Sequence, residues 1–310
     1  MAKYILFRLL RAVAVILAVL VSVFIIINAT GDPVRLMMPV DATEADIQQM
    51  RHTLGYDRPV LIRVVEFVAN AAHGDFGKSL RFMGEPALGL VVERLPATVT
   101  LAIASLLWSL PLSLVLGVIS ALQRHSWLSS FSTLLALFGQ SIPNFWLGIV
   151  LIMVFSVHFN LLPAYGEGTI QHLILPAVTL GFFPLARNSR MVRSMLLEVM
   201  AQDYIRTARA KGLTENAVIL YHAMKNALAP VITMLGLEIG TLLGGAVVVE
   251  TVFAWPGLGR LAVQSIFLRD FPVVQAAVFV VATGFVVINF FVDITYGWLD
   301  PRVQVSAKRL

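Results

Sequence analysis

The sequence predicts an all-α polytopic membrane protein with six transmembrane helices and both termini in the cytoplasm. Of the 310 residues, 58% are hydrophobic and 13% are charged, whereas soluble domains carry roughly a quarter charged residues. Several uncharged runs reach the roughly 20 residues that a helix needs to cross a bilayer core of about 30 Å. Lys and Arg are concentrated in segments that a six-span arrangement places on one side.

Six apolar runs account for the predicted spans. They cover Leu9–Ala29, Leu95–Leu122, Ser130–His158, Leu173–Met191, Asn226–Val249 and Val273–Tyr296. The first run is too long for a removable signal peptide, so we expect it to stay as a span. Pro143 lies inside the third run, and Pro176 and Pro184 lie inside the fourth. Membrane helices tolerate proline because neighbouring groups satisfy the freed carbonyls.

The distribution of Lys and Arg sets the predicted orientation. The segments assigned to the cytoplasm contain Lys3, Arg8, Arg11, Arg124, Arg187, Arg190, Arg193, Arg206, Arg209, Lys211, Lys225, Arg302, Lys308 and Arg309. On the opposite side, Gly31–Pro96 carries seven basic residues and nine acidic ones. Arg260 and Arg269 are the other basic residues assigned to that side. Because basic residues accumulate in cytoplasmic loops, both termini are expected to be cytoplasmic.

Residues 31–96 form a long external connection between the first helix, in residues 1–30, and a five-helix core in residues 97–310. Thr43-Glu44-Ala45-Asp46 predicts a helix start, and Gly55 predicts its end.

A second external helix is predicted between Pro59 and Gly74. Its apolar residues repeat with a helical period and form one face, comprising Val60, Leu61, Val64, Val65, Val68, Ala71 and Ala72. We expect two short amphipathic helices at the outer surface, either as a structural lid or as a docking platform for an external partner.

Composition excludes several classes of function. The chain has no cysteine, so disulfides, thiol catalysis and Cys-ligated metals are absent. It has no Gly-rich nucleotide-binding run ending in Lys-Ser or Lys-Thr, so we expect no ATP hydrolysis by this chain and no bound cofactor. The six histidines are not clustered as a metal site requires. The net charge of +5 is explained by cytoplasmic Lys and Arg rather than by nucleic-acid binding.

The connection between the fourth and fifth spans is the most distinctive segment. It begins Asp203-Tyr204-Ile205-Arg206-Thr207-Ala208-Arg209-Ala210-Lys211-Gly212, and it ends at Pro230. We predict a short basic helix, a break at Gly212, where glycine permits positive φ, and a second helix over Thr214–His222. By charge alone this is an ordinary basic loop; the alternative is a protruding knob on which a soluble partner pushes.

The residue order resembles permease subunits in the dipeptide, oligopeptide and nickel branch of ATP-binding-cassette importers, specifically the first permease chain of the dipeptide-type systems. The similar blocks span nearly the whole chain: Tyr4–Arg11, Thr30–Pro33, Leu54–Pro59, Gly74–Ser79, Glu93–Thr98, Asp203–Gly212, Asn226–Pro230, Glu250–Gly259 and Asp300–Arg302. One departure is that the general importer motif begins Glu-Ala-Ala. Here Arg206-Thr207-Ala208 stands in its place, so only Ala208 and Gly212 match, and the final Pro lies farther from the Gly. This is similar to the peptide-branch variant.

The resemblance implies the fold of type I importers and a position in the bacterial inner membrane. It also implies four kinds of partner: membrane lipid, a second homologous permease chain, two cytoplasmic ATPase subunits that bind ATP and Mg, and an external solute-binding protein. The cytoplasmic coupling segment, residues 198–226, would contact an ATPase. Its implied contact residues are Tyr204, Arg206, Thr207, Ala208, Arg209, Ala210, Lys211 and Gly212.

The fifth predicted span contains a glycine repeat and an acid. Gly236, Gly240 and Gly244 share one helix face, where small residues let another helix approach, and we favour this packing role over a ligand role. Glu238 lies about 200° around the helix from Gly236 at about 3.6 residues per turn. An ionisable residue in a span usually faces a cavity or a partner, so Glu238 either lines the substrate path or is a buried structural group.

Two further segments carry candidate polar contacts. Asn289 and Asp293 lie one turn apart in the sixth span, where a contact with a neighbouring span is expected. Glu250 begins a block in which Trp255-Pro256-Gly257 predicts a tight turn with the indole at headgroup level. By resemblance, this block contributes to an outer gate of the pathway.

The sequence therefore predicts a permease subunit that transports peptides or similar small solutes. Nickel chelates, glutathione and other small solutes remain alternatives for the substrate. An autonomous secondary transporter is the alternative of a different class, but the halves of the chain show no convincing repeat. A membrane enzyme would need a coherent catalytic set, which the sequence lacks.

Overall fold

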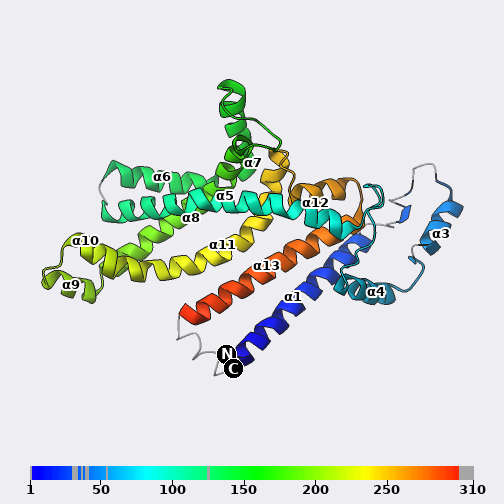
Figure 1. The fold of residues 1–310 in the computed structure, drawn as a ribbon, viewed down its shortest axis with the longest axis horizontal. Coiled ribbons are helices and arrows are strands. Elements are labelled where there is room, and N and C mark those ends of the chain that lie inside the picture. The colour runs from blue at the N-terminus through cyan, green and yellow to red at the C-terminus, as the bar shows by residue number, and fades with distance from the viewer. Residues whose placement is uncertain are drawn as a thin grey trace. The chain divides into compact units, whose positions relative to one another are not determined.

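The computed structural model describes residues 2–29, 34–35, 38, 42–53, 55–123 and 126–299. This part of the chain is helical apart from its connections and one isolated bridge between Lys78 and Pro86 (Figure 1). The helices divide into two compact units: a terminal unit, Met1–Thr98 with Pro256–Leu310, and a central unit, Val99–Trp255. The predicted segments group the chain differently, because the last helix falls in the same unit as the first.

The terminal unit is built on two long helices. In it, α1 (Ala2–Ala29) packs along α13 (Phe271–Leu299). The shorter helices of this unit are α3 (Glu44–Thr53), α4 (Val60–Ala72) and α12 (Leu258–Phe267), together with the beginning of α5 (Ala87–Leu122). A row of aromatic rings joins α1, α4, the following loop and α13; it consists of Phe24, Phe67, Phe76 and Phe279, with centroids 5.5, 6.1 and 5.0 Å apart.

Three of the four limits predicted for the two external helices are confirmed, and the fourth, at Pro59, is displaced by one residue. The Thr43 hydroxyl accepts a hydrogen bond from the Asp46 amide and donates one to the Asp46 carboxylate, which caps the start of α3. Gly55 and Gly74 follow α3 and α4 with φ of +69° and +79°, the left-handed geometry that favours glycine. Pro59 precedes the first residue of α4 instead of occupying it.

Only part of the predicted apolar face of α4 is buried. Ala71 is buried, and Val64 and Val68 are half-buried. Leu61 and Val65 are 81% and 68% exposed, so the apolar surface of α4 is wider than its contacts within the chain.

The central unit surrounds α8 (Ile170–Met200), which packs against α6 (Trp127–Ser141), α7 (Asn144–Leu151) and α11 (Met224–Val252). Three glycines allow close helix approach. A β carbon would lie 2.6 Å from Val192 Cβ at Gly117 and 2.6 Å from the Trp108 indole nitrogen at Gly181, and at Gly139 it would overlap Ala186. These close contacts join α8 to α5 and α6.

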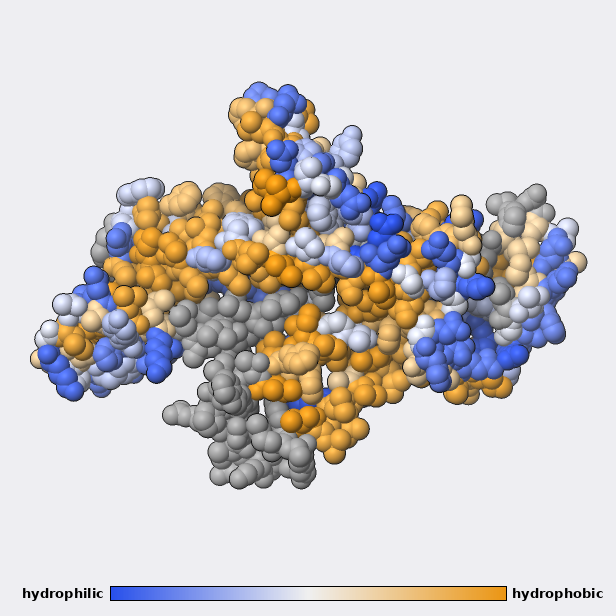
Figure 2. Space-filling view, in the orientation of Figure 1, coloured by the Kyte–Doolittle hydropathy of each residue, from blue (hydrophilic) through white to orange (hydrophobic). Residues whose placement is uncertain are grey.

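Four described helices are long and apolar enough to cross a membrane, within Ile5–Ala29, Ala87–Leu122, Ile170–Met200 and Phe271–Val292. A bent pair, Trp127–Ser141 with Asn144–His158, could supply a fifth crossing. Apolar residues cover α5 and α6, whereas α9 (Asp203–Ala210), α10 (Glu215–Ala217) and α3 are largely polar (Figure 2).

The prediction of one continuous third span over Ser130–His158 is wrong. The chain bends by 110° between α6 and α7, and α7 continues as the π-helical segment η1 (Ile152–His158). Ile142 has an extended ψ of 123° because proline disfavours the helical conformation of the residue before it. Pro143 is extended as well, with ψ of 139°. In contrast, α8 continues through Pro176 and Pro184 as predicted.

Candidate functional site

The coupling segment, residues 198–226, forms the connection between α8 and α11. Its first helix, α9, is amphipathic: Ile205 and Ala208 are buried, one turn apart. They pack in a cluster with Leu196 of α8 and with Val218 and Ala223 of η2 (Val218–Ala223). The inner face of α9 is thus fixed to both neighbouring helices.

The break predicted at Gly212 is confirmed. α9 ends at Ala210, and Gly212 has φ of +76° and donates to the Arg209 carbonyl at 2.9 Å. Across this turn, Arg209 Nε and Nη2 donate to the two carboxylate oxygens of Glu215 at 3.0 and 2.6 Å. These hydrogen bonds lower the pKa of Glu215 below its ordinary value and raise that of Arg209. The two-point contact clamps α9 to α10.

The two motif blocks of the segment meet through a side-chain bond. Asn226 Nδ2 donates to the Tyr204 hydroxyl at 2.8 Å, which joins the start of α9 to the start of α11. The helix predicted over Thr214–His222 runs as α10 and η2 directly into α11, without a second break.

The outer face of the coupling segment is exposed. Of the eight predicted contact residues, Ala208 alone is buried, and Tyr204, Arg206, Thr207, Arg209, Ala210, Lys211 and Gly212 are exposed. Leu220 and Tyr221 extend this surface, with 63% and 75% of their areas exposed. A mixed basic and aromatic surface is therefore held on a buried apolar base.

Glu238 is buried in the central unit, 4% exposed. Asn188 of α8 donates a 2.6 Å hydrogen bond from Nδ2 to Glu238 Oε2. The bond joins α8 to α11, so the acid has a structural partner that the sequence did not identify. Glu250 lies 12 residues further along α11, which is about 18 Å at 1.5 Å per residue, so the two acids do not form one site.

A tight turn forms at the end of α11, just before the predicted Trp255-Pro256-Gly257 position, and the tryptophan is buried. Ala254 has φ of +51°, and the Trp255 amide donates to the Glu250 carbonyl at 2.9 Å. Trp255 is 7% exposed, so protein covers an indole that was predicted to lie at headgroup level. Pro256 and Gly257 begin the second segment of the terminal unit, where Gly257 is the residue before α12.

The glycine repeat of α11 behaves unevenly. Gly240 is buried, whereas Gly244 is exposed and a β carbon there would meet no described atom within 4 Å. For Gly236 only its place in α11 is described, and the side chain of Asp293 lies outside the described residues. The blocks Thr30–Pro33 and Asp300–Arg302 lie outside them as well.

A buried clasp in the terminal unit was missed. Asp270, before the first residue of α13, accepts hydrogen bonds from the Ser79 hydroxyl and from the Leu80 and Arg81 amides at 3.2 and 3.3 Å. Both Asp270 and Ser79 are buried. Ser79 and Asp270 are 191 residues apart, so no local sequence signal could have identified this clasp.

A second contact links two of the motif blocks in this unit. The Thr98 hydroxyl accepts a 2.8 Å hydrogen bond from the Leu258 amide at the start of α12. The Glu93–Thr98 and Glu250–Gly259 blocks therefore meet where Thr98 caps a helix.

Comparison with known proteins identifies the family. The family described as "Binding-protein-dependent transport system inner membrane component" matches residues 113–305, and the corresponding N-terminal membrane component matches residues 1–102. The chain belongs to this permease family. It is 40% identical over 305 residues to the glutathione transport system permease protein GsiC of Escherichia coli (strain K12), covering 98% of this chain and 99% of GsiC.

A second permease relative is equally similar. The oligopeptide transport system permease protein AppB of Bacillus subtilis (strain 168) is 41% identical over 315 residues, covering 98% of this chain and 100% of AppB. A chain in the inward-facing MetNI methionine ABC transporter aligns with a TM-score of 0.49 and 21% identity, covering 68% of this chain and 94% of that one. The family match and the two permease relatives make the chain a multi-pass permease subunit of an ABC importer in the dipeptide and oligopeptide branch, and the secondary-transporter alternative is set aside.

Proposed function

We propose that the coupling segment is the surface through which a cytoplasmic ATPase drives this permease. One observation carries the proposal: the segment is fixed on its inner side and exposed on its outer side. Ile205 anchors its base, and the Arg209–Glu215 clamp and the Tyr204–Asn226 bond fix its outline. Because the segment is held at these points, a movement of the bound ATPase would shift α8 and α11 instead of deforming the segment.

A charge exchange separates the clamp from direct contact with the partner. Arg209→Glu should reduce ATP-dependent uptake, because it reverses a charge on the exposed outer face and places two carboxylates together at the clamp. The double variant Arg209→Glu with Glu215→Arg should restore uptake, since the opposite charges again face each other. Recovery assigns Arg209 to the clamp; no recovery assigns it to the ATPase contact. Normal uptake by Arg209→Glu itself would contradict the proposed role of the segment.

The proposed assembly contains a second homologous permease chain, two ATPase subunits and an external solute-binding protein, embedded in lipid. ATP and Mg would bind in the ATPase subunits, with no cofactor on this chain. Residues 31–96 would lie outside, where α3 and α4 form either a lid or a docking platform for the binding protein. Glu238, Glu250 and the Trp255–Gly257 turn are the candidate pathway residues.

We further propose six spans with both termini in the cytoplasm. Hydrogen bonds bring Ser120, Thr133 and Arg193 together from α5, α6 and α8. In the six-span order these positions fall at the cytoplasmic ends of the second, third and fourth spans. The proposed order therefore requires the three residues to lie on the same side of the membrane, and these hydrogen bonds support it.

The absence of cysteine makes the topology directly testable. Single-cysteine variants at Lys211 and Lys78, both exposed, need no background removal. In intact spheroplasts a membrane-impermeant maleimide should label the Lys78→Cys variant alone, and permeabilisation should add the Lys211→Cys variant. Labelling of both in intact spheroplasts would contradict the arrangement.

The proposed substrates are small peptides, with glutathione included, because one relative carries each of these names at nearly equal identity. Nickel chelates and other small solutes are the competing class. Uptake of labelled glutathione, a tripeptide and a nickel chelate by cells expressing the complete importer distinguishes them. Transport of the chelate without either peptide would overturn the proposal.

A further inference from the structure

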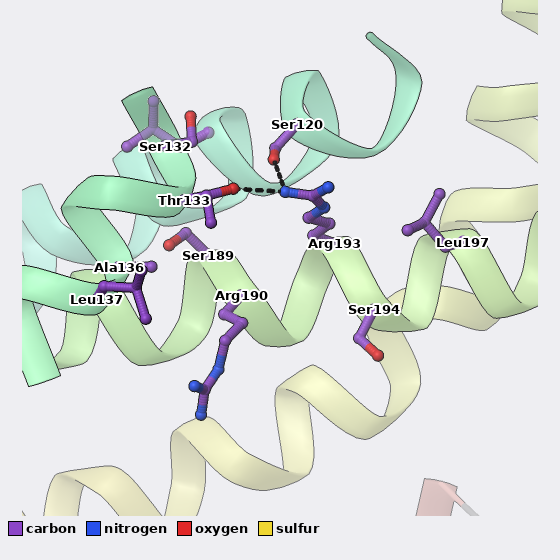
Figure 3. Close-up of a pocket in the computed structure, with 11 residues that line it drawn as sticks. Ser120, Ser132, Thr133, Ala136, Leu137, Ser189, Arg190, Arg193, Ser194 and Leu197 are labelled. Atoms are coloured by element: carbon purple, nitrogen blue, oxygen red, sulfur yellow. Dashed lines mark hydrogen bonds between the residues drawn. The ribbon is translucent and has the colours of Figure 1, made fainter. Parts of the chain in front are cut away.

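A cavity of about 360 Å³ lies within the central unit, between α5, α6 and α8. Its walls include Leu116 and Ser120 from α5, Thr133, Ala136 and Leu137 from α6, and Ser189, Arg193 and Leu197 from α8 (Figure 3). It contains neither the coupling segment nor the Asn188–Glu238 pair.

One corner of this cavity carries an uncompensated positive charge. Arg193 Nη1 donates to the Ser120 hydroxyl at 3.0 Å and to the Thr133 hydroxyl at 2.6 Å (Figure 3). Both partners are neutral, and no carboxylate among the described residues lies within salt-bridge distance of this guanidinium. A guanidinium has five N–H donors, so three remain for an anion.

The rest of the cavity is mostly apolar, with Leu116, Leu137 and Leu197 in its walls. Arg190 also lines it, but its guanidinium points away from Ser120 and Thr133 (Figure 3). The cavity therefore combines one fixed cationic corner with apolar walls. An amphiphile with an anionic head and a hydrocarbon chain matches this combination, whereas a free small anion would leave the apolar walls uncovered.

The position along the chain favours a lipid. Arg193 follows the fourth predicted span by two residues, and Ser120 and Thr133 lie near the ends of their own predicted spans. On the topology proposed above, this corner lies at headgroup level in the cytoplasmic leaflet. Anionic phospholipids are enriched there and attract Lys and Arg.

We infer that this cavity binds an anionic phospholipid, with its phosphate on Arg193 and an acyl chain along Leu116 and Leu137. Arginine suits the site because its planar donors match phosphate oxygens. Ser120 and Thr133 hold the guanidinium in place before the lipid binds. The lipid would fill the space between α5, α6 and α8.

Lipid retention on the purified complete importer tests the inference. Native mass spectrometry after incubation with phosphatidylglycerol, phosphatidylcholine or inorganic phosphate gives the bound fraction of each probe. We expect wild type to retain phosphatidylglycerol over phosphatidylcholine by about fivefold or more, and Arg193→Gln to remove that preference. Arg190→Gln removes the same charge one turn away and should keep the preference.

A second variant guards against a folding effect of Arg193→Gln. Leu137→Glu leaves Arg193 and its two hydroxyl partners in place, but it sets a carboxylate in the wall and should repel the phosphate. Equal retention of the two lipids by wild type would overturn the inference. So would equal loss in both arginine variants, which indicates general charge attraction, or binding of inorganic phosphate in place of the lipid. Labelling of the cysteine variants reports on the topology independently.

Discussion

The coupling segment and the motif blocks of the terminal unit both belong to the set of blocks that resemble the family, yet their polar side chains have different partners. In the terminal unit, Ser79 bonds to Asp270 and the Thr98 hydroxyl caps the start of α12, all within the chain. In the coupling segment, Arg206 and Lys211 are exposed on the outer face, and the bond of Arg206 to Asp203 stays within α9. A motif whose polar groups find partners internally specifies the fold, whereas one that presents them outward is available to another protein.

The largest effect is expected from Gly212→Pro in the coupling segment. Proline fixes φ near −65°, and Gly212 has φ of +76°, so the turn cannot form. ATP-dependent uptake should fall to background while the chain still inserts in the membrane.

Gly212→Asn is the matched control for this change. Asparagine tolerates the left-handed region, and a β carbon at this position meets no described atom within 4 Å. It should keep most of the uptake. Equal loss in both variants would show that the site needs the absence of a side chain instead of the turn.

Removing the Asp270 clasp of the terminal unit should lower the stability of the protein and not its transport activity. Asp270→Ala leaves the Ser79 hydroxyl and two backbone amides without their acceptor, at a cost of about 3 kcal/mol. The thermal midpoint and the membrane level should drop, but uptake per remaining molecule should hold. Asp75→Asn changes an exposed carboxylate in the same loop and should be nearly neutral. Loss of uptake per molecule in Asp270→Ala would contradict the claim that this clasp stabilises the fold without taking part in transport.

Helix packing in the central unit gives an intermediate effect. Gly181→Ala would place a methyl group 2.6 Å from the Trp108 indole nitrogen and should cost about 2 kcal/mol through overpacking. Gly244→Ala adds the same methyl group where no described atom lies within 4 Å, and it should not lower detergent stability, because alanine favours the helix over glycine. If Gly244→Ala lowered stability more than Gly181→Ala did, and only in the assembled importer, a partner chain would pack at Gly244.

The smallest effect is expected from acidification of the Arg209–Glu215 clamp. Since the folded pKa of Glu215 lies below its unfolded value, the clamp stabilises the segment above the unfolded pKa and is lost as pH falls through the folded pKa. Both side chains are exposed, so the contribution is a few tenths of a kcal/mol up to about 1. After correction for the intrinsic pH dependence of chemical exchange, the rate of amide hydrogen exchange near Gly212 should rise at acid pH in wild type. In the Glu215→Gln variant the corrected rate should not depend on pH. Identical profiles would contradict the clamp.

Local signals predicted much of the fold. The caps at Thr43, Gly55 and Gly74, the continuity of α8 and the turn at Gly212 all depend on residues close in sequence. The continuous helix predicted for the third span was wrong because the run is apolar throughout, and apolarity does not reveal the bend at Pro143.

Contacts between distant residues were not predictable in the same way. Asn188–Glu238 and Ser79–Asp270 are separated by 50 and 191 residues, so no periodicity or spacing brings them together. The close approach of helices was expected at Gly236, Gly240 and Gly244 of α11. The structure has it at Gly117, Gly139 and Gly181 and not at Gly244, because which small residue meets a neighbouring helix depends on how the helices pack. Close approach at Gly236 and Gly240 stays a prediction.

Site-specific crosslinking of the complete importer tests the central claim most directly. Lys211→Cys carries a photoreactive maleimide on the outer face of the coupling segment, and Lys78→Cys carries it in the terminal unit. We predict that the probe at position 211 attaches to an ATPase subunit and the probe at 78 does not. Attachment of the 211 probe to the external binding protein, or to the permease chains alone, would contradict the assignment of this segment to ATPase coupling.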